Sequence, residues 1–158
     1  MIQRRPIKPS VALAKLQELC ARSEQCSYEI LTRLKKWGVP DSTSAKILAL
    51  LKRDRYVNDS RYVEAFVRDK IVFNRWGRTK IRLALVQKHL PSDLIAEGLE
   101  SIDNDEYVMA LTEVLESKSR ALQDVSTYDA RMKLLKYAVS RGFEMGVASE
   151  MIKKLFPR

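Results

Sequence analysis

The fold follows from the stretch ILTRLKKWGV at residues 30–39, which recurs as IRLALVQKHL at 81–90 and as LLKYAVSRGF at 134–143. The recurrence is separated by 51 and then 53 residues, and apolar residues occupy the first, fifth and last positions of every copy. Any two amphipathic helices share a period of about 3.6 residues, so a chance match is the alternative. The shared turn at the end of each stretch argues against chance, and the alignment runs on to Leu48, Leu99 and Ile152 without a gap. We interpret the pattern as a threefold internal repeat.

Apolar residues recur at helical spacing along nearly the whole chain, whereas the alternation typical of strands is scarce. The pattern predicts nine helices, three in each repeat, and hence an all-α protein. A unit of about 50 residues buries too little apolar surface to be stable alone, so we expect neighbouring repeats to share a core in an elongated, curved array. The predicted division is a basic arm at 1–9 followed by three-helix repeats at 10–57, 58–103 and 104–158.

The turns and caps of this array are also predicted from residue type. Gly38 and Gly142 end the second helix of their repeats, because glycine accepts left-handed backbone. His89 holds the same place in the middle repeat, and histidine enters that region more often than most other residues, so we expect the same turn there. Ser27 is expected to cap the second helix with its side chain, and the turn at 56–60 to cap the fourth.

Composition limits the possible classes of protein. The 158 residues are 46% hydrophobic and 31% charged with few Gly and Pro, which is typical of a folded chain. No uncharged run approaches the roughly 18 residues of a membrane span, and the start MIQRRP lacks the apolar core of a secretory signal, so we expect a cytoplasmic protein. Two cysteines, Cys20 and Cys26, are too few for a disulfide scaffold and are expected to be reduced.

Charge is unevenly distributed along the sequence. The net charge is +9, and the excess of Lys and Arg lies before residue 91. Between Ser92 and Glu116 there are eight acidic residues and no Lys or Arg; we call this stretch the acidic segment. A basic front suggests a polyanionic or nucleoprotein partner, although solubility alone is the alternative. The acidic segment could contact a basic protein surface, orient the chain on DNA or simply be solvated.

Motifs of enzymatic chemistry are missing from the sequence. It has no glycine-rich phosphate loop, and His89 is its only histidine, so a Ser-His-Asp or Cys-His arrangement would have to use it. The cysteine spacing is poor for zinc, and Val108 stands where a calcium loop starting at Asp103 needs glycine. We therefore predict that the protein is not an enzyme and carries no cofactor or metal.

The strongest candidate for a phosphate-binding surface lies in the middle repeat. Arg78 and Arg82 are four residues apart on the predicted fifth helix, where we expect them to form one exposed strip. Trp76 beside them could stack on a base or brace the turn. The alternative is a solvated face with Trp76 in the core. The predicted filament- or phosphate-binding residues are Arg68, Lys70, Arg75, Arg78, Lys80 and Arg82.

Two further basic regions are weaker candidates. The N-terminal arm carries Arg4, Arg5 and Lys8 without acids, and disorder is its simpler interpretation. In the first repeat, cations surround Trp37 and follow the third helix, where they also suit the helix dipole. This second patch consists of Arg33, Lys35, Lys36, Lys52, Arg53 and Arg55.

Several segments together resemble the RecX family, the bacterial regulators of the RecA recombinase. The most specific is YVNDSRY at 56–62, which runs into AFV at 65–67. The others are Arg22 with SYEI at 27–30, Leu34 and Gly38; WG at 76–77 before Ile81, Leu85 and Lys88; and RGF at 141–143. The resemblance covers roughly residues 10–156, and it departs from the family's glycine turn at His89.

This resemblance implies a crescent-like protein that binds RecA filaments on single-stranded DNA and has no chemistry of its own. It also implies that RecA's ATP hydrolysis, strand exchange and coprotease activity are inhibited. We expect a monomer with RecA and the DNA within the filament as its partners. The rival hypothesis is a helix-turn-helix-like protein that binds bare DNA, with Lys46, Lys52 and Arg53 of the third helix in a major groove.

Overall fold

The computed structural model describes residue 5 and residues 7–158, and in them the chain forms nine α-helices and no strands. The all-α prediction is confirmed. Arg4, part of the predicted basic arm, lies outside the described residues. The helices are α1 (Pro9–Arg22), α2 (Ser27–Lys36), α3 (Asp41–Arg53), α4 (Asp59–Val72), α5 (Arg78–Gln87), α6 (Ser92–Glu100), α7 (Asn104–Ser119), α8 (Tyr128–Ser140) and α9 (Met145–Leu155).

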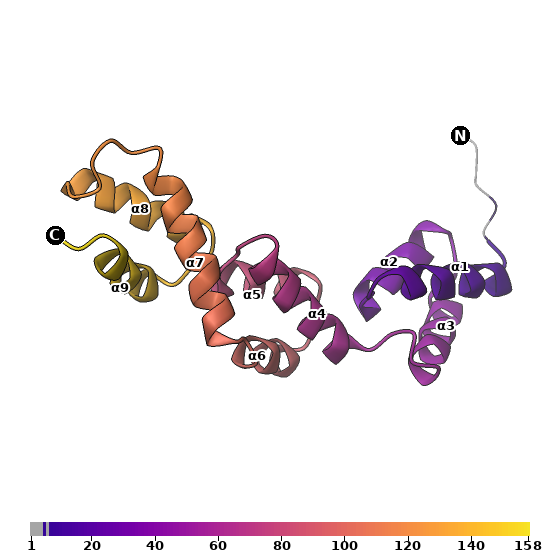
Figure 1. The fold of residues 1–158 in the computed structure, drawn as a ribbon. Helices are drawn as coiled ribbons and strands as arrows, with labels where there is room; N and C mark the ends of the chain where they lie inside the picture. Colours follow the sequence, from indigo (N-terminus) through magenta and orange to yellow (C-terminus); the bar gives the residue numbers. More distant parts are fainter. Residues whose placement is uncertain (1–4, 6) are drawn as a thin grey trace.

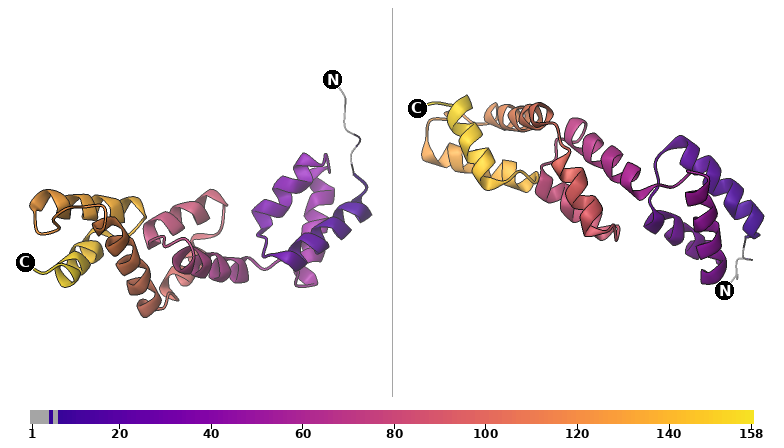
Figure 2. Two further views of the ribbon diagram at one scale, coloured as in Figure 1. Left: turned by 45° about the horizontal axis from the view of Figure 1, so that its top comes forward. Right: turned by 90° about the horizontal axis from the view of Figure 1, so that it is seen from below.

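The helices are arranged in an elongated row (Figure 1). Contacts join α1–α3, α4–α6 and α7–α9 into what we call the N-terminal, middle and C-terminal groups, and α4 also contacts α7. Two further views show the same order along the row, with α1 and α9 toward opposite ends (Figure 2). The molecule therefore exposes a large surface for its size, which is typical of stacked helical units.

The same turn ends the second helix of each group. The backbone φ is +74° at Gly38, +55° at His89 and +96° at Gly142, so the predicted left-handed turn at His89 is confirmed. In each turn the residue after the left-handed one donates its N–H to the carbonyl five residues earlier: Val39 to Leu34 (3.0 Å), Leu90 to Leu85 (3.5 Å) and Phe143 to Ala138 (3.1 Å). This bond satisfies a carbonyl that the helix end leaves unpaired. The division into three repeats stays a prediction, which the matching turns support.

Apolar packing is divided into two clusters rather than one continuous core. The middle and C-terminal groups share a large cluster that includes Val63, Leu85, Tyr107 and Phe143. The N-terminal group has its own cluster around Leu16, Leu34 and Leu51. The prediction of a core shared by all neighbours is therefore right for α4–α9 and wrong for α1–α3, from which Cys26 alone belongs to the large cluster.

Close backbone packing joins the middle group to the C-terminal group. Gly77 donates its N–H to the carbonyl of Arg141 at 2.9 Å, and Thr79 donates to that of Gly142 at 3.0 Å. A Cβ atom added at Gly77 would lie 2.3 Å from the backbone of Gly142, so only glycine fits there. The α8–α9 turn thereby caps the first turn of α5.

Candidate nucleic-acid interface

Trp76 holds two ammonium groups at a fixed place on the surface. Lys70 Nζ lies 4.8 Å and Lys80 Nζ lies 4.6 Å from the centre of its ring, within the range of a cation–π attraction. The backbone N–H of Trp76 donates to the carbonyl of Lys70 at 2.9 Å. The ring is half-buried against the large cluster. Trp76 thus braces the turn after α4 and positions cations from α4 and α5 together.

Arg78 does not form the predicted exposed strip with Arg82. Its guanidinium makes an ion pair of 3.1 Å with Glu144 and lies 4.0 Å from the centre of the Tyr107 ring. Its backbone N–H donates to the Tyr107 hydroxyl at 3.1 Å, and that hydroxyl donates to Glu144. Since Glu144 draws the side chain inward, Arg78 joins α5 to the C-terminal group, and the prediction of its exposure is wrong.

The environment of Tyr107 keeps this link intact at ordinary pH. The side chain is buried, and burial together with the hydrogen bond to Glu144 raises the pKa of Tyr107 well above its usual range. A phenolate there would face a carboxylate in a poorly solvated site. The hydroxyl therefore stays protonated and donates to Glu144.

Arg68 and Arg75 contact the acidic segment. Arg68 lies 3.6 Å from Glu106, and Arg75 makes an ion pair with Glu113. Both glutamates are on α7. All four side chains are substantially exposed, so each pair contributes little to stability and can be broken at low cost. In each pair the arginine and the glutamate are 38 residues apart in the sequence. No local sequence pattern could have indicated that they pair.

Arg82 is the predicted residue that is most open to a partner. It is exposed, and none of the ion pairs between described residues includes it. Leu83 and Val86 on the same helix are 59% and 53% exposed. Arg82 and Val86 are one turn apart, and Leu83 lies beside them, so α5 presents a cation next to apolar surface. We call Lys70, Trp76, Lys80, Arg82, Leu83 and Val86 the α5 surface.

The second basic patch is spread over the N-terminal group. Its six Lys and Arg residues are exposed, and Arg53 pairs with the adjacent Asp54. Trp37 packs against the smaller cluster, and Lys15 Nζ lies 5.8 Å from the centre of its ring. In the arm, Arg5 and Lys8 are exposed, while Ile7 packs beside Trp37 and donates its N–H to the Trp37 carbonyl at 3.4 Å.

A polar network joins the N-terminal group to the middle group. Glu29 of α2 accepts hydrogen bonds from the Tyr62 hydroxyl at 2.8 Å and from Lys88 Nζ at 2.7 Å. Arg61 pairs with Glu24 at 2.6 Å, and the rings of Tyr28 and His89 lie 4.6 Å apart. Ser27 does not cap α2 with its own side chain; instead Asp59 of α4 caps it. We call these contacts the polar junction.

Known RecX proteins are similar to this chain in sequence. A family model described as the second three-helix domain of RecX matches residues 58–99. The regulatory protein RecX of Clostridium beijerinckii is 27% identical over 129 residues, which are 80% of this chain and 60% of that protein. That of Amycolatopsis mediterranei is 23% identical over 94% of this chain and 87% of its own length. The chain is thus similar to RecX regulatory proteins over most of its length.

Solved RecX structures have the same fold. The crystal structure of RecX from Lactobacillus salivarius superposes with a TM-score of 0.81 at 18% identity, over 93% of this chain and 96% of that one. Another crystal structure of regulatory protein RecX gives a TM-score of 0.79 at 20% identity, over 92% of this chain and 71% of the other. The chain spans about 60% of the length of the clostridial RecX relatives.

Three residues of the most specific RecX-like segment lie in the polar junction. Asp59, Arg61 and Tyr62 of YVNDSRY all contact the N-terminal group.

Burial raises the pKa of Cys20 and of Cys26, which disfavours a nucleophilic thiolate. Over residue 5 and residues 7–158, no three His, Cys, Asp or Glu side chains gather in a way that could hold a metal ion. In the same part of the chain, no helix combines the length and apolarity of a membrane span.

Proposed function

We propose that this chain binds RecA filaments on single-stranded DNA and inhibits RecA's ATP hydrolysis, strand exchange and coprotease activity. It would act in the cytoplasm as a monomer and without chemistry of its own. Similarity to RecX regulatory proteins supports the choice of RecA as partner. The observation that carries the proposal is the α5 surface, where exposed Leu83 and Val86 lie beside Arg82 and the cations held on Trp76.

A filament presents protein and phosphate together, and the α5 surface has groups for both. Lys70, Lys80 and Arg82 supply positive charge that phosphates attract. Exposed leucine and valine side chains gain free energy by contact with apolar protein surface, which a phosphate backbone does not offer. The combination suits a nucleoprotein better than naked DNA.

Arg68 and Arg75 have a second role in this proposal. Their carboxylate partners are exposed, so a phosphate can replace Glu106 or Glu113 without a large loss of stability. The acidic segment then weakens binding to arbitrary DNA while leaving these cations available to a filament whose protein positions the phosphates. Arg78 is a positioning residue, because it holds α5 against Tyr107 and Glu144.

The test is a titration of the purified chain into RecA, ATP and single-stranded DNA. We expect DNA-dependent ATP hydrolysis to fall at protein concentrations that barely shift the same DNA without RecA. Strand exchange and RecA's coprotease activity should fall over the same range. Tight, sequence-selective binding to bare duplex with no effect on hydrolysis would contradict the proposal and support the helix-turn-helix hypothesis, in which exposed Lys46 and Lys52 of α3 enter a groove.

A further inference from the structure

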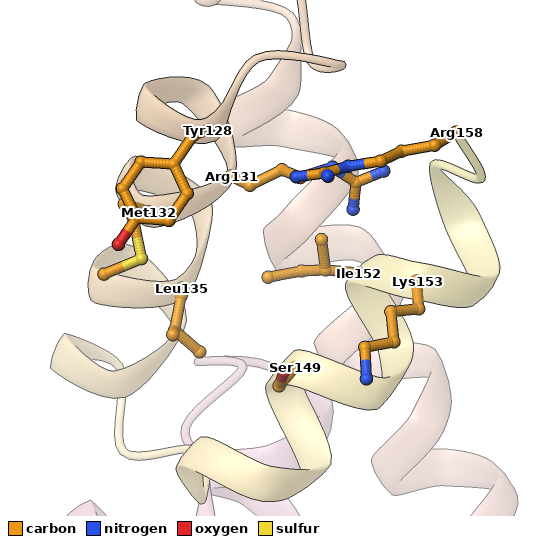
Figure 3. A pocket seen from close by; sticks show the side chains of 8 residues that line it. All are labelled: Tyr128, Arg131, Met132, Leu135, Ser149, Ile152, Lys153 and Arg158. Carbon is orange, nitrogen blue, oxygen red and sulfur yellow. The ribbon is translucent and has the colours of Figure 1, made fainter.

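A pocket opens between α8 and α9, on helices other than those of the α5 surface (Figure 3). Its volume is about 490 Å³, which is within the range of pockets that bind ligands, about 300–1,000 Å³. The residues that line it are Tyr128, Arg131, Met132, Leu135, Ser149, Ile152, Lys153 and Arg158.

The walls of the pocket are apolar and its rim is cationic. Met132 and Leu135 of α8 lie opposite Ile152 of α9, and the Tyr128 ring adds further apolar surface at the mouth (Figure 3). Arg131 and Arg158 lie at one end, and Lys153 lies on α9. None of the lining residues is acidic. A ligand must therefore combine an apolar body with negative charge.

Neither Arg131 nor Arg158 pairs with a side-chain carboxylate of the described residues. Arg131 donates to the backbone carbonyl of Phe156, which carries no charge, and its buried Nε has no hydrogen-bond partner among the described residues. None of the ion pairs between described residues includes Arg131 or Arg158. Lys153 pairs with Glu150 at 3.5 Å on an open surface. The rim thus retains positive charge beside a low-dielectric wall, where an anion is bound more strongly than in water.

We infer that this pocket binds a short segment of a partner protein in which a large apolar side chain lies next to carboxylates. The apolar side chain would fill the space between Met132, Leu135 and Ile152, and the carboxylates would pair with Arg131 and Arg158. A peptide fits better than a nucleic acid, because a single small pocket with apolar walls can take one side chain but offers no groove that follows a phosphate backbone. The site is independent of the α5 surface and of the proposed inhibition of RecA.

The experiment is fluorescence anisotropy of a fluorescein-labelled peptide, Gly-Ser-Asp-Glu-Phe-Leu-Glu-Gly, titrated with the full chain. We expect saturable binding that is lost when Phe and Leu of the peptide are replaced by Ser, and also when its acidic residues are replaced by Lys. The variant Lys153→Glu with Arg158→Glu should bind at least about fivefold more weakly, because two rim charges are reversed. Met132→Ser should weaken binding by a similar factor through the lost apolar contact.

A matched control carries the same change of charge elsewhere on α8. Lys133 and Lys136 are exposed and do not line the pocket, so Lys133→Glu with Lys136→Glu should leave binding within about twofold. Circular dichroism should show unchanged helicity in both double variants. Absence of binding by the acidic apolar peptide, equal loss in the two double variants, or unchanged binding after the Met132 substitution would overturn the inference. So would displacement of the peptide by an oligothymidylate that binds the wild type more tightly than the peptide does.

Discussion

The Asp59 carboxylate of α4 accepts hydrogen bonds from both the backbone N–H and the hydroxyl of Ser27, at 2.8 and 2.7 Å. Ser27 is the first residue of α2, so the helix receives its cap from the next group along the chain. An anion at a helix N-terminus also interacts favourably with the helix dipole. One side chain therefore couples the order of α2 to the docking of α4.

Removal of this cap should loosen the N-terminal group. We expect Asp59→Ala to lower the free energy of unfolding of α1–α3 by about 1–2 kcal/mol, the usual cost of a lost cap. Urea unfolding followed by far-ultraviolet circular dichroism measures the change. Asp69→Ala, at an exposed position of the same helix, is the control and should change stability by less than about 0.5 kcal/mol. Equal effects of the two substitutions would contradict the capping role.

Two apolar clusters joined by a polar junction should unfold in two steps. Trp37 lies in the smaller cluster and Trp76 against the larger one, so each tryptophan reports on one part of the molecule. With Trp76→Phe as background, Leu34→Ala should shift the Trp37 fluorescence transition by about 2–5 kcal/mol. With Trp37→Phe as background, the same substitution should barely move the Trp76 transition. Coincident transitions that shift together would show a single cooperative unit.

The left-handed turn at His89 has a measurable cost. At a φ of +55° a residue with a Cβ is strained, while glycine is not. We expect His89→Gly to be more stable than His89→Ala by about 1 kcal/mol in urea unfolding, since both lose the ring contact with Tyr28 and differ only in backbone freedom. A more stable alanine variant would contradict this assignment of strain.

Much of the fold was predictable because it depends on local patterns. The helical period, the turns at Gly38, His89 and Gly142, and the cap at Asn58, whose side chain accepts the Arg61 N–H at 3.0 Å, all involve residues close in sequence. The positive φ angles of Arg55 and Arg75 were not predicted. Arginine carries no residue-type signal for left-handed backbone. At both places the next residue donates its N–H back to the preceding helix, Tyr56 to the Leu51 carbonyl at 2.8 Å and Trp76 to the Lys70 carbonyl at 2.9 Å.

The candidate site was predicted less well, because long-range pairing decides which cations are free. Arg78 meets Glu144 across 66 residues, and Arg68 and Arg75 meet the acidic segment across 38. The exposure and clustering of charged side chains can be estimated from sequence. Which charged residue of another helix pairs with a given arginine cannot. The sequence indicates a dense basic region around Lys70 and Lys80, but not that both ammonium groups lie against the Trp76 ring.

Arg78 and Arg82 should therefore respond differently to charge reversal. Arg82→Glu should reduce inhibition of RecA's ATP hydrolysis by at least about fivefold without changing the melting temperature, because the side chain is exposed and unpaired among the described residues. Arg78→Glu should lower stability by about 1–3 kcal/mol, since Glu144 would face a second carboxylate in a half-buried site. Lys133→Glu controls for net charge. Unchanged inhibition by the Arg82 variant would remove it from the proposed interface.

The buried tyrosines should make the fold sensitive to alkali. The pKa values of Tyr62 and Tyr107 are raised in the folded state, chiefly by burial and then by their carboxylate partners. The stability they contribute is complete below the unfolded-state pKa of about 10 and is lost as pH rises above it, because the unfolded chain releases protons that the folded chain retains. Each tyrosine should add about −1.4 kcal/mol per pH unit to the slope of the unfolding free energy against pH in that range.

Urea unfolding between pH 9.5 and 11.5 should show a shallower slope for Tyr107→Phe, with exposed Tyr128→Phe as the unchanged control. Identical slopes for the wild type and Tyr107→Phe would mean that Tyr107 ionises as readily in the folded chain as in the unfolded one.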